Sequence, residues 1–137
     1  MIQPRPIGGI ITRRGRDAFR ASEPGCIVIP GVGTFRYLSG WWWQASIPLC
    51  VAWIVNLMPL SRSLIIASCF HDWTECLSMF SQRRRDQIYI HLARMDGCSR
   101  YQCAVMYRAI RLAGPFRGRA TSEDRDEARR LGSFVPE

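Results

Sequence analysis

The feature that most constrains this chain is a long stretch without any charged side chain, from residue 37 to residue 61. The hydrocarbon core of a bilayer needs about 20 mostly apolar residues in a helix, so this stretch is long enough to span it. Two polar residues and two prolines interrupt it: Gln44, Asn56, Pro48 and Pro59. The stretch must therefore lie either in lipid or in the core of the protein.

Three consecutive tryptophans, Trp41, Trp42 and Trp43, lie near the start of this stretch. An indole ring has a large apolar body and one N–H donor, and it therefore favours the interface between membrane and water. We expect residues 41–60 to span or insert into a membrane, with the three tryptophans at its interface. The alternative is that the segment forms the central core helix of a soluble fold.

The segments after this stretch have the apolar spacing of amphipathic helices. Residues 63–82 place Ile66, Phe70, Trp73, Leu77 and Phe80 on one face. Residues 86–95 form a second such segment that ends at Gly97. A third runs over residues 100–112, with a face that uses Tyr101 and Val105. The sequence predicts a mainly α fold: a small helical protein with one apolar, transmembrane-type helix and amphipathic helices after it.

Three regions follow from composition. Residues 1–25 are rich in arginine, glycine and proline, and we expect them to form a disordered basic arm. Residues 26–114 hold the helices, preceded by a short β-hairpin over residues 26–38 around a Pro-Gly turn. Residues 115–137 form a linker and a polar helix that opens at a capping box and has no apolar face to bury.

The segment IVIPGVGTF, residues 27–35, resembles the oxyanion-strand motif of the glutamine amidotransferase subunit of histidine biosynthesis. That family uses a cysteine nucleophile in a glycine-rich turn, and Cys50 is the candidate that the resemblance implies. The chain departs from the family pattern, because Cys50 has no flanking glycine and no Cys-His-Glu arrangement follows. The sequence therefore does not predict amidotransferase activity.

The charge of the chain indicates an anionic partner. All 19 basic residues are arginine, against 11 acidic residues, which gives a net charge of +8. Arg83, Arg84 and Arg85 are the candidate anion-binding group, with the headgroups of a lipid bilayer as the expected partner. A soluble arginine-rich module that binds nucleic acid is the alternative, with Arg94, Arg100 and Arg108 as further phosphate contacts.

The absence of lysine also bears on whether the chain has a function. Lysine and asparagine share codons that begin with two adenines, and the chain has one asparagine and no lysine. This bias is typical of an overprinted, organellar or lineage-restricted reading frame, and a frame with no selected function is therefore a further alternative. The arginines of residues 1–20 make a mitochondrial location an alternative within the expected membrane localisation.

Metal binding and catalysis are not predicted. The metal-ligating residues are spaced too widely for a structural zinc site, which usually pairs its ligands closely. No nucleophile and base can be paired from spacing, so the sequence predicts no cofactor and no enzyme, and a binding or anchoring role in a membrane instead. The residues considered as ligands are Cys69, His71, Cys76, His91, Cys98 and Cys103.

Overall fold

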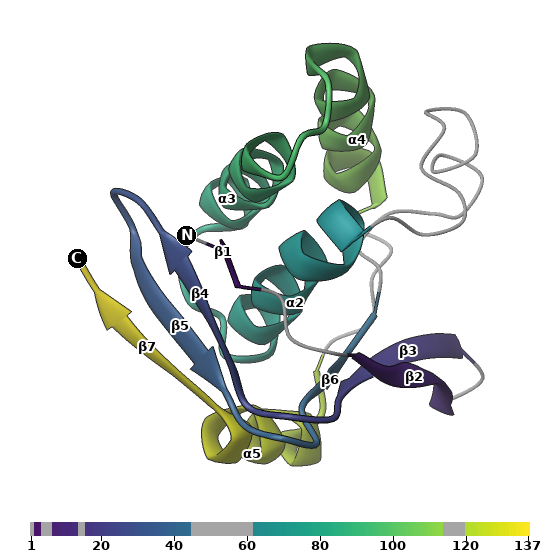
Figure 1. Ribbon diagram of the computed structural model, residues 1–137, viewed down its shortest axis with the longest axis vertical. Helices are drawn as coiled ribbons and strands as arrows, with labels where there is room; N and C mark the ends of the chain where they lie inside the picture. Colours follow the sequence, from purple (N-terminus) through teal and green to yellow (C-terminus); the bar gives the residue numbers. More distant parts are fainter. Residues whose placement is uncertain (1, 4–6, 14–15, 45–61, 114–119) are drawn as a thin grey trace. The chain divides into compact units, whose positions relative to one another are not determined.

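The computed structural model describes residues 2–3, 7–13, 16–44, 62–113 and 120–137 of the chain (Figure 1). The chain divides into two compact units. The sheet unit contains residues 1–44 together with residues 120–137, and the helical unit contains residues 45–119.

Two antiparallel sheets make up most of the sheet unit. The first has the strand order β1-β4-β5-β7 and the second has the order β2-β3-β6. β7 comes from the C-terminal end of the chain and pairs with β5, so the two ends of the sequence form one sheet. The strands are β1 (Ile2–Gln3), β2 (Ile7–Arg13), β3 (Arg16–Ala21), β4 (Gly25–Ile29), β5 (Gly33–Tyr37), β6 (Trp42–Trp43) and β7 (Gly132–Pro136).

The burial of the first sheet follows the two-residue period of a strand. In β4, Ile27 and Ile29 are buried while Val28 between them is 37% exposed. In β5, Phe35 and Tyr37 are buried on the same alternation. Ile27 pairs with Phe35 across the two strands, so the buried residues of β4 and β5 form one apolar face.

The tryptophans belong to the sheet unit. Trp41 and Trp43 are each 2% exposed, and the Trp43 ring lies 6.1 Å from Phe19 and 6.2 Å from Tyr37, measured between ring centroids. The Nε1 of Trp42 donates a hydrogen bond of 2.9 Å to the carboxylate of Glu127. These indoles therefore make aromatic contacts and a hydrogen bond within the sheet unit.

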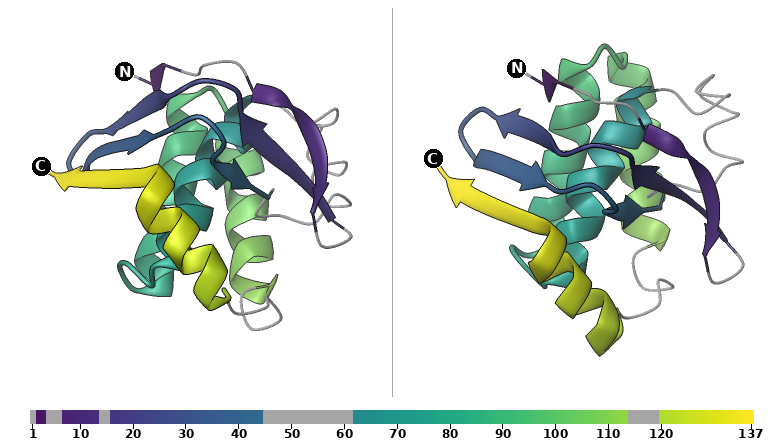
Figure 2. Two further views of the ribbon diagram at one scale, coloured as in Figure 1. Left: turned by 90° about the horizontal axis from the view of Figure 1, so that it is seen from below. Right: turned by 60° about the horizontal axis from the view of Figure 1, so that its bottom comes forward.

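Helix α5 (Ser122–Leu131) leads directly into β7, as Figure 2 shows. It begins at a capping box, because the Thr121 hydroxyl accepts from the Asp124 N–H while the Asp124 carboxylate accepts from the Thr121 N–H. Ala128 and Leu131 are buried. The expectation that this helix has no apolar face to bury is wrong.

Three helices form the described part of the helical unit: α2 (Arg62–Cys76), α3 (Gln82–Met95) and α4 (Arg100–Ala113). α3 begins where the Ser81 hydroxyl accepts from the Arg84 N–H, and it ends before Gly97, which has a φ of +106°. α4 begins at a similar reciprocal cap, in which Ser99 and Gln102 bond each other's backbone N–H. α3 and α4 thus begin where a serine hydroxyl accepts from a free backbone N–H, and α3 ends before a glycine with a positive φ.

The buried face of α4 differs from the expected one. Tyr101 is 66% exposed, and the buried residues are Cys103, Met106 and Ile110. Both sets have helical spacing, so periodicity alone did not distinguish them. In α2, Ile66, Phe70 and Trp73 are buried as expected, with the last two rings stacked 6.2 Å apart. The helix ends at Cys76, so Leu77 and Phe80 of the expected face lie beyond it, and Phe80 is 37% exposed.

The predicted fold class is wrong in two respects. The chain is not mainly α, because it combines four described helices with two antiparallel sheets. Among the helices of the described residues, none is both long enough and apolar enough to cross a bilayer. The expectation of a membrane protein with a transmembrane helix loses its support with that finding, although residues 45–60 of the proposed span lie outside the described residues.

The disordered arm is also corrected. Residues 1–25 contain β1, β2, β3 and the first residue of β4. β2 and β3 pair from Arg13 and Arg16 outward, with an irregularity between Ile7 and Ile10, where two glycines lie. Glycine permits such a bulge, so these residues do not prevent strand formation.

Candidate functional site

The helical unit contains a buried polar network to which each of its described helices contributes one side chain. His71 of α2 lies with its Nε2 2.8 Å from Oδ1 of Asp86 in α3. The guanidinium of Arg111 in α4 donates to Oδ2 of the same carboxylate over 3.2 Å. The side chains of His71 and Asp86 have no exposed surface, while that of Arg111 is 41% exposed.

The surrounding helices fix the imidazole of His71. The Tyr89 ring of α3 meets it edge-on, with centroids 5.4 Å apart and an interplanar angle of 73°. The Thr74 hydroxyl donates to the His71 carbonyl over 2.9 Å. His71 lies between Phe70 and Trp73 in the sequence of α2, and all three side chains are buried. The position of the ring is therefore set by packing and by hydrogen bonding together.

The network compensates the cost of burying the Asp86 carboxylate. Removing a carboxylate from water is costly unless partners compensate it. Each of the two Asp86 oxygens accepts a hydrogen bond, one from the His71 imidazole and one from the Arg111 guanidinium, and these partners replace the lost water. This residue consequently joins three helices through one side chain.

The other side of the imidazole faces carboxylates of its own helix. Nδ1 of His71 lies 4.0 Å from Oε2 of Glu75, which is one helical turn further on. Asp72 also contributes, since the ligand atoms of His71, Asp72 and Glu75 all lie within 4.8 Å of one another. Both carboxylates are half-buried. We call these three residues the α2 cluster.

The tautomer of His71 links the two sides of the ring. A neutral imidazole that donates its Nε2 hydrogen to a carboxylate carries its lone pair on Nδ1. Metal-binding histidines have this arrangement, in which a carboxylate holds one nitrogen while the other binds the ion. The Asp86–His71 hydrogen bond therefore prepares Nδ1 to act as a ligand beside two carboxylates.

Of the six residues that the sequence offered as metal ligands, only His71 belongs to the α2 cluster. Cys69, Cys98 and Cys103 are buried, Cys76 is half-buried and His91 is exposed. Sequence reasoning missed Asp72 and Glu75 as partners. Their positions one and four residues after His71 on a predicted helix were the available signal, because residues four apart share a helix face.

The candidate anion-binding arginines divide into two kinds. Arg83 and Arg84 are exposed at the start of α3. Arg85 is half-buried, and its guanidinium donates to the carbonyls of Met79 and Phe80 over 3.2 and 3.0 Å. Since Phe80 has a positive φ of 62°, Arg85 holds a strained connection between α2 and α3.

Two buried thiols lie at the start of α4. Cys98 and Cys103 occupy the positions directly before and four residues after the Ser99 cap, which are the positions of a hydrophobic staple. Burial raises the pKa of the Cys103 thiol above its ordinary value of 9.0, and the nearby Cys98 raises it further, while Arg94 opposes both effects. Cys103 is therefore held as a neutral thiol.

Residues 43–110 of the chain match the model of a family described as "Protein of unknown function (DUF1353)". The matched segment is similar to that family. It includes the α2 cluster and Asp86, and it ends one residue before Arg111. No curated protein and no solved structure matches the chain. The similarity therefore covers α2, α3 and most of α4, and it names no activity.

Proposed function

We propose that the helical unit binds one divalent metal ion through Nδ1 of His71 and the carboxylates of Asp72 and Glu75. The observation that carries this proposal is the 2.8 Å hydrogen bond between Asp86 and Nε2 of His71. This bond orients the imidazole and leaves its second nitrogen directed toward the two carboxylates. The donor from Arg111 fixes Asp86 in turn.

The donor set favours a first-row transition ion. One imidazole nitrogen and two carboxylate oxygens suit Zn²⁺ or Mn²⁺ better than Mg²⁺ or Ca²⁺, which prefer oxygen ligands alone. A neutral imidazole with two carboxylates also neutralises the charge of a divalent ion. We therefore expect Zn²⁺ to bind more tightly than Mn²⁺, in line with the general order of affinities.

Three protein ligands leave at least one coordination position for water. This open arrangement is typical of catalytic zinc sites, whereas structural sites use four protein ligands. A bound ion of this kind lowers the pKa of its water and makes hydrolysis accessible at neutral pH. The proposal differs from the binding role without catalysis that the sequence predicted, and no observation yet tests that earlier expectation.

Metal binding is tested by isothermal titration of the metal-free full chain with Zn²⁺, followed by elemental analysis after gel filtration. We expect one ion per chain. Asp72→Asn and Glu75→Gln should each weaken binding at least tenfold, since each removes one ligand charge. Asp96→Asn is the matched control, because it removes one carboxylate from the same unit outside the α2 cluster, and it should bind as the unchanged chain does.

Asp86→Asn tests the orienting role. Its amide can accept from Nε2 but carries no charge, so we expect binding weakened by about 10-fold to 100-fold, as is usual for such partners. Folding of each variant is checked by far-ultraviolet circular dichroism. The proposal fails if the unchanged chain binds no ion, or if Asp72→Asn and Glu75→Gln bind as tightly as Asp96→Asn.

A further inference from the structure

A second feature of the helical unit lies outside the α2 cluster, on the outward faces of α3 and α4. We propose that these faces bind the phosphate backbone of nucleic acid. The exposed positions of the two helices repeat with the same helical spacing, at Arg83, Arg84, Gln87, His91, Arg94 and Met95 in α3, and at Arg100, Tyr101, Ala104, Arg108, Arg111 and Leu112 in α4.

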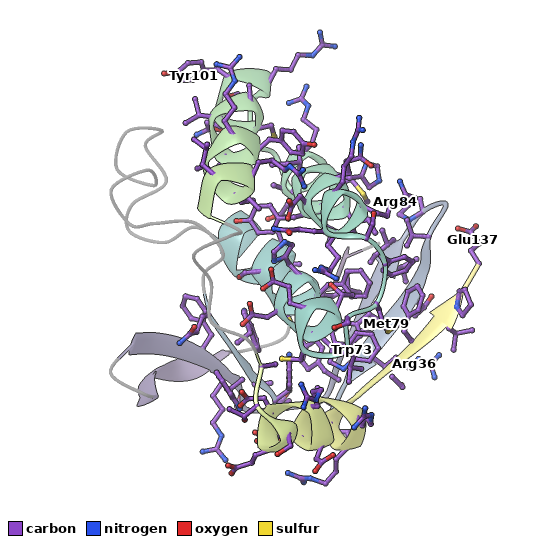
Figure 3. All side chains as sticks on the ribbon, turned by 180° about the vertical axis from the view of Figure 1, so that it is seen from behind. Arg36, Trp73, Met79, Arg84, Tyr101 and Glu137 are labelled. Carbon is purple, nitrogen blue, oxygen red and sulfur yellow. The ribbon has the colours of Figure 1, made fainter. Side chains whose placement is uncertain are left out.

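Four of the arginines on these faces are available to a ligand. Arg83, Arg84, Arg100 and Arg108 are exposed, and within the described residues none of their guanidinium groups donates to another group. The guanidinium of Arg94 donates a hydrogen bond to the Cys98 carbonyl, and that of Arg111 donates to Asp86. Figure 3 shows the Arg84 and Tyr101 side chains extending outward from their helices. We call the four available residues the arginine face.

Arginines outnumber acidic residues in the helices that carry the arginine face. α4 contains no acidic residue, and the one acid of α3, Asp86, is buried. The helical unit as a whole holds ten of the 19 arginines but only four of the 11 acids. Of these four, Asp72 and Glu75 belong to the α2 cluster, away from the arginine face in sequence. The fourth acid, Asp96, is half-buried at the end of α3, so the outward faces of the two helices carry an excess of positive charge.

The length of the two helices and the residue type suit the phosphate backbone of nucleic acid. Each helix has 14 residues, which is a length of about 21 Å, and a duplex carries one charge per about 1.7 Å over such a length. Guanidinium groups form paired hydrogen bonds with phosphate oxygens. Contacts to phosphates alone carry no sequence information, so we expect binding that is independent of sequence.

The test uses the full chain and a fluorescently labelled DNA duplex, with binding followed by anisotropy at several salt concentrations. The variant replaces the arginine face with glutamine: Arg83→Gln, Arg84→Gln, Arg100→Gln and Arg108→Gln. We expect affinity to fall at least tenfold at low salt. The slope of log K against log salt should also become shallower, by up to about 0.9 for each phosphate contact removed.

The matched control removes four exposed arginines from the sheet unit: Arg36→Gln, Arg125→Gln, Arg129→Gln and Arg130→Gln. Both variants have the same net charge, and the control should keep the affinity and slope of the unchanged chain. Equal losses in the two variants would show that net charge alone drives binding and would overturn the proposal. It is also overturned if the unchanged chain binds no duplex, or if it binds vesicles of anionic lipid in preference to DNA.

Discussion

Asp86 connects the three described helices of the helical unit through one side chain. Its two carboxylate oxygens receive one donor from α2 and one from α4, while the residue itself belongs to α3. Sequence could not predict this network, because its members are 15 and 25 residues apart and no local spacing connects them. The cluster of His71, Asp72 and Glu75 was within reach of the sequence, since those residues share one helical turn.

We expect Asp86→Ala to destabilise the chain by about 3–5 kcal/mol, because it leaves a buried imidazole and a guanidinium without their shared acceptor. The free energy of unfolding is measured by urea titration of the full chain. Asp126→Ala is the control, since Asp126 pairs with Arg129 at the surface and such pairs contribute under about 1 kcal/mol. Comparable losses from the two substitutions would contradict the buried network.

Cys103 gives a prediction that depends on pH. Burial, together with the neighbouring Cys98, raises the pKa of its thiol above 9.0, so the folded state holds the proton more tightly than the unfolded state. The resulting stability is fully present below about pH 9 and is lost as the pH rises through the folded pKa. Cys103→Ala should therefore flatten the decline of the unfolding free energy between pH 8 and pH 10.5. Cys26→Ala, in the sheet unit, should leave that decline unchanged, and an identical effect of the two substitutions would refute the assignment.

Among the elements, the starts of α4 and α5 and the end of α3 were predicted from local signals, whereas the connection between α2 and α3 was misplaced, because α2 ends at Cys76 and α3 begins at Gln82. Ser99, Thr121 and Gly97 act by local hydrogen bonding or backbone freedom, which sequence records directly. The strands before residue 25 were not predicted, because glycine and arginine obscure their apolar pattern and their partners lie elsewhere in the chain. The face of α4 was assigned wrongly, since a helix with apolar residues on several sides does not specify which side meets its neighbours.

The turn between β4 and β5 offers a matched pair of glycines. Gly31 has a φ of +74° with open space around it, whereas Gly33 has a φ of +152° and a Cβ there would collide with the Val135 carbonyl of β7. Gly31→Ala should cost about 1–2 kcal/mol from backbone strain alone. Gly33→Ala should cost more and should also weaken the β5–β7 pairing.

Urea unfolding measures the stability of the two glycine variants, and amide hydrogen exchange measures the protection of β7. We expect faster exchange in β7 for Gly33→Ala and unchanged exchange for Gly31→Ala. If both substitutions have the same effect on stability and on β7 protection, a Cβ at position 33 does not disturb β7, and the predicted extra loss of unfolding free energy for Gly33→Ala is wrong.

In the whole molecule, the residues of both proposed binding sites lie in one of the two compact units. The two sheets and the tryptophans belong to the sheet unit, while the polar network, the α2 cluster and the arginine face belong to the helical unit. From the sequence we predicted a basic surface that binds an anionic partner. We also interpreted the uncharged stretch as a single helix. An uncharged run carries the same composition whether it forms a strand, a core segment or a membrane span. For that reason Trp41–Trp43 were expected at a lipid interface. Within the sheet unit, the Trp43 ring packs beside Phe19 and Tyr37.

X-ray absorption spectroscopy of the zinc-loaded chain tests the proposed metal binding by the α2 cluster. We expect nitrogen and oxygen neighbours only, at about 2.0–2.1 Å from the ion, together with the more distant scattering signal of one imidazole. Sulfur neighbours at about 2.3 Å would contradict it, because they would place the ion on cysteines. A shell of water oxygens without an imidazole would also contradict it, because His71 would then not be a ligand.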